Sequence, residues 1–145
     1  MPEFFHSSAG PQLVPIIGTA SSEHFLVSDG PNGGPIERIM LDIGGENQAS
    51  VRVAGNALAP TYRDGDVVIG QRLEQFDDGL GRDCIVATEN GRGHLCILRP
   101  GLEPGRYSLR SYNPAIADIE SVRPLWVAKV IWVGWPEHRS RDRRG

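Results

Sequence analysis

The sequence predicts a mainly β fold, and three observations support this prediction. The 145-residue chain contains 18 glycines and 11 prolines, a content that favours many turns and short strands over long helices. Asn90-Gly91 separates the apolar runs Asp83–Thr88 and His94–Arg99, and Asn-Gly is the strongest short signal for a β-hairpin. Leu125–Trp135 is a long run of Leu, Val, Ile and Trp, which predicts a strand that is either central or covered by a partner.

The N-terminal third of the chain alternates between linker, strand and loop signals. Residues 1–12 are polar and lack a period, so we interpret them as a linker or disordered N-terminus. An extended segment is expected at Leu13–Gly18. Phe25–Pro35 is predicted to be a loop because its Pro and Gly residues exclude helix and central strand. Ile36–Ile43 has an ambiguous period, whereas Ala49–Val53 alternates and predicts a strand.

Turn signals separate the remaining predicted strands. Asn56–Pro60 is expected to form one helical turn with Asn56 as a candidate cap. Asp64 and Asp66 invite a catalytic interpretation, but hydrogen bonding within the turn before the next strand accounts for them better. Further strands are expected at Val67–Gln71 and Arg106–Ser111.

Composition and spacing narrow the class of function. A formal net charge of −3 does not suit a free-standing nucleic-acid binder, although residues 137–145 form an Arg-rich tail that we interpret as flexible. A phosphate-contacting arm is the alternative interpretation of this tail. No apolar run or secretory signal indicates a membrane or exported protein, so a cytoplasmic location is expected. The four histidines and two cysteines lack ligand spacing, so we expect no metal and no cofactor.

Several motifs occur in a fixed order along the chain. The segment Gly55-Asn56-Ala57-Leu58-Ala59-Pro60 is followed by Asp64-Gly65-Asp66 and a hydrophobic run. Pro15-Ile16-Ile17-Gly18 precedes it, and Leu109-Arg110-Ser111-Tyr112-Asn113-Pro114 follows. Together with the Trp-containing last strand, these motifs resemble the C-terminal domain of LexA and CI-like repressors, within the LexA/signal-peptidase superfamily of serine peptidases. The resemblance covers about Val14–Trp135.

This resemblance implies a fold and a domain organisation. The fold is a twisted, barrel-like β structure with one or two short helical turns and a protruding N-terminal strand pair. Residues 13–136 would form the peptidase-like domain, between the linker at 1–12 and the tail at 137–145.

The residues that catalyse cleavage in the family are replaced here. Active relatives carry Ser where this chain has Ala57, and counting along Gly93–Pro100 places their Lys at Leu98. Alanine cannot form an acyl-enzyme, and leucine cannot act as a general base. The bond that such proteins cleave in themselves would fall near Ser22-Glu23, where their Ala-Gly is missing. We therefore expect no catalytic residue and no enzyme activity.

The resemblance also implies a regulatory role. In relatives this domain follows a helix-turn-helix domain, dimerises the repressor and, in active members, cleaves itself when DNA is damaged, as in the SOS response. We expect a catalytically inactive dimerisation and partner-binding module of a bacterial or phage transcriptional regulator. Its partners would be a second copy, another protein or a homologous regulator, and DNA would be bound only through a separate helix-turn-helix domain, which is not seen before Leu13.

Two surfaces are candidates for binding. The first is the cleft around Ala57, formed with Asn56, Leu58 and Pro60, which could accept a peptide strand by β-addition. The second is the last strand, with the alternating residues Trp126, Ala128, Val130 and Trp132. Two other functions stay open. The chain could be a self-cleaving Ser-Lys peptidase trapped by a Ser→Ala change at position 57, or a free-standing anti-regulator that binds an active homologue.

Overall fold

Ten strands and two short 3₁₀ helices make up the described part of the chain, which comprises residues 12–28, 35–41 and 47–134 of a computed structural model. The helices are η2 (Phe76–Gly79) and η3 (Glu89–Gly91). The strands are β1 (Gln12–Ala20), β2 (His24–Leu26), β3 (Glu37–Leu41), β4 (Gln48–Val53), β5 (Val67–Arg72), β6 (Asp83–Thr88), β7 (Arg92–Pro100), β8 (Tyr107–Arg110), β9 (Ile119–Val122) and β10 (Trp126–Gly134).

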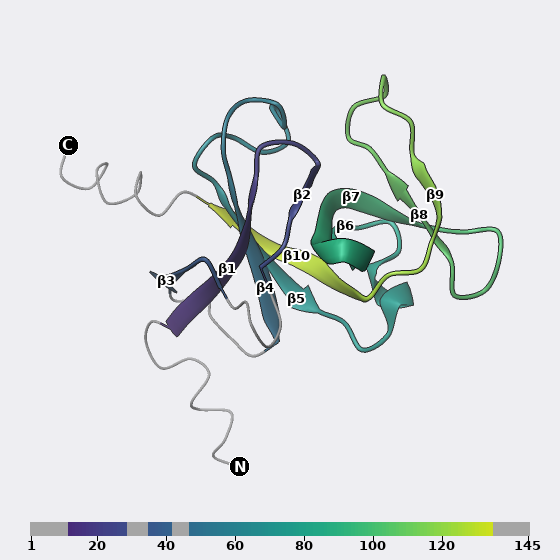
Figure 1. Ribbon diagram of the computed structural model, residues 1–145, viewed down its shortest axis with the longest axis horizontal. Helices are drawn as coiled ribbons and strands as arrows, with labels where there is room; N and C mark the ends of the chain where they lie inside the picture. The colour runs from purple at the N-terminus through teal and green to yellow at the C-terminus, as the bar shows by residue number, and fades with distance from the viewer. Residues whose placement is uncertain (1–11, 29–34, 42–46, 135–145) are drawn as a thin grey trace, which may run out of the picture.

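All strands belong to one open sheet, with the order β3-β1-β4-β5-β10-β6-β7-β8-β9 and with β2 paired to β7. Figure 1 shows β1, β3, β4 and β5 in one group and β6 to β9 in another, with β10 running between them. Residues Trp126–Lys129 of β10 pair with β6, and Ala128–Gly134 pair with β5. The last strand is therefore central and joins the two halves of the sheet.

Three groups of apolar side chains form the core. The largest packs β1, β2, β4 and β10 against the segment after β4, through residues such as Ile17, Val51 and Tyr62. A second group lies between β6, β7, β8 and β10, and includes Leu98 and Val127. The third lies under β1 and β5, where Trp132 of β10 packs against it. Burial of this apolar surface is the main stabilising term for a sheet of short strands.

The mainly β class predicted from the sequence is confirmed, and the strands form one open, ten-stranded sheet. The strands at Leu13–Gly18, Ala49–Val53 and Val67–Gln71 lie where they are expected, and so does the hairpin around Asn90-Gly91. Gly91 has a φ of 69°, which explains the need for glycine in this turn.

Three local predictions need correction. Phe25 and Leu26, expected in a loop, belong to β2, because they pair with Gly93 and Arg92 of β7. The strand β9 has no clear period in the sequence and was not expected. Gln12, expected at the end of the linker at residues 1–12, belongs instead to β1. The rest of the expected linker, most of the Pro- and Gly-rich loop and the Arg-rich tail lie outside the described residues.

Candidate functional site

The segment between β4 and β5 folds into a tight turn that presents Ala57. Gly55 has a φ of 85°, a conformation that residues with a Cβ rarely adopt. Hydrogen bonds from the Ala59 amide to the Asn56 carbonyl (3.1 Å) and from the Tyr62 amide to the Leu58 carbonyl (2.9 Å) give the expected helical turn. Leu58 and Tyr62 are buried in the core, whereas Ala57 is exposed. The buried side chains of Leu58 and Tyr62 thus fix the turn on the core, and Ala57 is left exposed to solvent.

Two carboxylates hold the far side of this turn. Asp64 accepts a hydrogen bond from the Gly55 amide at 2.7 Å, and Asp66 accepts one from the Arg63 amide at 2.9 Å. Both contacts are to backbone groups, as the turn interpretation of these residues predicted. Their side chains fix the backbone, and neither lines the pocket beside Ala57.

Ala57 lines a pocket of about 310 Å³ together with Glu23, which belongs to the predicted cleavage-equivalent segment. The Glu23 carboxylate is buried and accepts hydrogen bonds from the Ser111 hydroxyl (2.8 Å) and the Tyr112 amide (3.0 Å). The Glu23 carbonyl also accepts a bond from the Leu95 amide at 2.9 Å. The chain therefore lays its own β1–β2 connection against the turn of Ala57. Ser22 is exposed and bonds to His24 instead.

Two tyrosines, Tyr62 and Tyr112, form a hydrogen-bonded pair next to the pocket of Ala57. The hydroxyls of Tyr62 and Tyr112 lie 3.1 Å apart, and the Tyr112 hydroxyl donates to the Cys96 carbonyl at 3.2 Å. Burial, as the largest cause, raises the pKa of both phenols above their ordinary value. Both tyrosines are consequently neutral hydrogen-bonding groups at physiological pH, and neither can serve as a base.

The structure does not bring Leu98 to the pocket of Ala57. The Leu98 side chain is fully buried among Cys84, Val86, Cys96, Tyr107, Leu109 and Val127. Its neighbour Ile97 points to the other face of β7 and lines a second hollow. Position 98 therefore serves packing in this chain.

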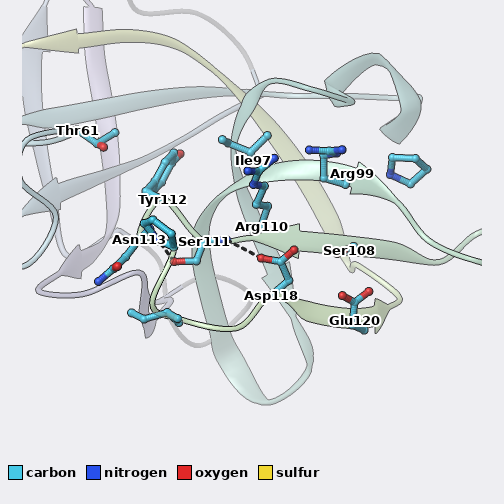
Figure 2. A pocket seen from close by; sticks show the side chains of 13 residues that line it. Thr61, Ile97, Arg99, Ser108, Arg110, Ser111, Tyr112, Asn113, Asp118 and Glu120 are labelled. Carbon is cyan, nitrogen blue, oxygen red and sulfur yellow. Dashed lines mark hydrogen bonds between the residues drawn. The ribbon is translucent and has the colours of Figure 1, made fainter.

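This second hollow has a volume of about 760 Å³ and adjoins the first. Thr61, Tyr112, Asn113 and Pro114 line both. Figure 2 shows Arg99 and Arg110 on one side of the hollow, and Asp118 and Glu120 on the other. The surface beside the Ala57 turn thus carries charge of both signs.

No lysine or histidine lines either hollow among the described residues. The hydroxyls of Thr61, Ser108 and Ser111 are present, and Ser111 donates a hydrogen bond to the Glu23 carboxylate. A carboxylate is a much weaker base than an amine or an imidazole, and it is poorly suited to activate a serine hydroxyl. An arginine is always protonated and cannot accept the proton either. Among the described residues that line these two hollows, no hydroxyl is paired with an amine or an imidazole.

The four predicted surface residues of the last strand face inward to different degrees. Ala128 is fully buried, and Val130 packs on the largest core group. Trp126 packs on the same group and carries the Arg72 guanidinium 4.4 Å from its ring centre. The exposed apolar residues of β10 are Ile131 and Val133.

The architecture is that of a peptidase-like β domain, in which the connection between the first two strands rests on a glycine-bounded turn. A family model described as Peptidase S24-like matches residues 15–135, so the chain belongs to this family. A search of curated proteins found no match. Within the described residues no helix is long and apolar enough to cross a bilayer.

Sequence reasoning missed several groups of the site. It named Glu23 only for its place along the chain, although Glu23 is the buried carboxylate of the pocket. Tyr112 and Ser111 lie in the Asn-Pro motif, so the motif pointed to the right segment without showing their contacts. The pairing of His24 with His94 left no signal, since 70 residues separate them.

Proposed function

We propose that this chain is a catalytically silent S24-like domain that acts as the dimerisation and partner-binding module of a bacterial or phage transcriptional regulator. The observation that carries the proposal is the pocket of Ala57. It keeps a tight turn with the β1–β2 segment docked against it, while its described lining residues include no lysine or histidine. A peptidase-like fold that retains its cleft without the catalytic groups can still serve as a binding domain.

The docked segment supports a binding role. Glu23 is held in the pocket by a side-chain hydroxyl and a backbone amide, so the chain occupies its own cleft in the absence of a partner. A protein partner that inserts an extended peptide by β-addition would have to displace this segment. The cleft would then act as a site for exchange between an internal and an external strand.

The second half of β10 supports dimerisation. Ile131 and Val133 are 46% and 41% exposed, which is high for residues of a central strand. The ladder with β6 ends at Lys129, whereas the ladder with β5 continues to Gly134. An apolar pair beside the end of a ladder is a suitable contact for the same strand of a second copy, related by a twofold axis.

We expect the chain to be a dimer at tens of micromolar, and the double change Ile131→Asp with Val133→Asp to weaken the dimer about 100-fold. Burying two unpaired carboxylates at the interface accounts for the loss, and the fold should persist because both side chains face solvent in the monomer. Light scattering across a dilution series measures the dissociation.

The matched control is Leu102→Asp, which changes a fully exposed leucine in the turn between β7 and β8. It should leave the dimer unchanged. A monomeric parent chain, or a double variant as dimeric as the control, would refute the assignment of this surface.

A further inference from the structure

Two histidines from separate parts of the sequence meet across neighbouring strands. His24 of β2 is directly opposite His94 of β7 in the antiparallel ladder. Their Nδ1 atoms lie 2.8 Å apart, and the rings stand at 72° with centroids 4.9 Å apart. The two Nδ1 atoms therefore face each other between the strands, and one of them must carry a proton for this contact to be a hydrogen bond.

A third group fixes one of the rings. The Thr88 hydroxyl lies 3.0 Å from Nε2 of His94. When Nε2 carries the ring proton and donates it to Thr88, the Nδ1 lone pair of His94 is directed at His24. Burial, with His24 and Arg92 as lesser causes, lowers the pKa of His94 to about 4, so its imidazole is neutral at pH 7. Histidine ligands of metals are commonly oriented by such a second hydrogen bond.

We propose that His24 and His94 form a two-histidine site for a late divalent transition metal such as Zn²⁺. The ion takes the place of the proton between the two Nδ1 atoms, and this proton moves to Nε2 of His24, so that both rings bind as neutral ligands. Neutral imidazole is a preferred ligand of this class of ion. No group of three His, Cys, Asp or Glu residues gathers in the described ranges, so water would complete the coordination.

The geometry requires only a small adjustment. Two nitrogens bound tetrahedrally to Zn²⁺ lie about 3.3 Å apart, so the Nδ1 atoms must separate by about 0.5 Å. His24 is exposed on the short strand β2 and can make this movement. Arg92 near His94 opposes a second cation, so we expect micromolar rather than nanomolar affinity.

Metal binding would affect the pocket of Ala57 through the backbone. His24 follows Glu23, and His94 precedes Leu95, whose amide donates to the Glu23 carbonyl at 2.9 Å. A metal bridging the two histidines would clamp β2 on β7 next to this bond. It would therefore hold the Glu23 segment in place and slow its displacement.

Titration of the metal-free full chain with Zn²⁺ by calorimetry tests the site. We expect one saturable Zn²⁺ per chain and, at about 100 times the dissociation constant, a rise of about 5 °C or more in the thermal midpoint. His24→Ala should abolish both effects while leaving the fold intact, because His24 is exposed. Mg²⁺, which prefers oxygen ligands, should have no effect.

The chain has two further histidines, His6 and His138, and these supply the control. A His6→Ala, His138→Ala double variant should keep the single Zn²⁺ site. Imidazole ¹⁵N spectra provide a separate measurement, since Zn²⁺ should shift Nδ1 of His24 and His94 together. Absence of saturable binding, binding that survives in His24→Ala, or spectra that leave these two Nδ1 signals unchanged would overturn the proposal.

Discussion

Replacing Leu98 with lysine is expected to lower the free energy of unfolding by about 3–5 kcal/mol. Leu98 is fully buried in a group of apolar side chains between β7, β8 and β10. A lysine there would lose the packing of the isobutyl group and would place an amine where no water reaches it. Typical domains have only about 5–15 kcal/mol of stability, so this change would remove much of it. Urea unfolding followed by fluorescence measures the loss.

Ile97→Lys is the matched comparison at the next position of the same strand. Ile97 is half-buried and lines the hollow that carries Asp118 and Glu120 as well as Arg99 and Arg110. An amine there can reach water, so we expect a loss of about 1 kcal/mol or less. Equal losses for the two variants would show that Leu98 does not face the core.

Replacing Glu23 with alanine is expected to destabilise the chain by about 2–3 kcal/mol and to open the β1–β2 connection to proteases. The change removes the acceptor of the Ser111 hydroxyl and of the Tyr112 amide, which lie 2.8 Å and 3.0 Å from the carboxylate. Groups that lose their partner inside a pocket cost more than the same groups in water. Limited proteolysis with mapping of the first cut, together with urea unfolding, measures both effects.

Two further substitutions distinguish the effect of the Glu23 hydrogen bonds from the effect of its negative charge. Glu23→Gln keeps an oxygen that can accept both hydrogen bonds, so we expect about half of the loss seen with alanine. Glu120→Ala removes an exposed carboxylate near the other hollow and should change stability by less than about 0.5 kcal/mol. If Glu23→Ala were as stable as Glu120→Ala, the docked segment would not depend on this carboxylate.

Much of the fold could be predicted because its signals are local. The Asn90-Gly91 turn, the alternation in Ala49–Val53 and the apolar run of the last strand each depend on neighbouring residues, and each strand lies where it is expected. The strand β2 could not be predicted in this way. It is only three residues long, and its pairing with β7 is set by residues about 70 positions away. The strand β9 lies at the sheet edge, and only two of its four residues are even partly buried.

The sequence predicted which positions belong to the candidate site, but it did not predict the contacts between their side chains. The turn around Ala57 follows from glycine and aspartate signals that act within a few residues. The direction of a side chain on β7 depends on the sheet as a whole, so counting along a motif could not tell that Leu98 enters the core and Ile97 the hollow. The contact of Glu23 with Ser111 joins residues 88 positions apart, and only the folded chain brings them together.

Placing a serine hydroxyl at position 57 tests most directly whether this domain lacks the groups needed to cleave itself. The Ala57→Ser chain would be incubated at about pH 10, where a lysine amine begins to lose its proton, and its intact mass would be measured over time. A single unchanged mass is expected, because the described groups around this position include no amine or imidazole to activate the serine. Two fragments arising from a cut near Ser22-Glu23 would show that a working base remains and would contradict the account.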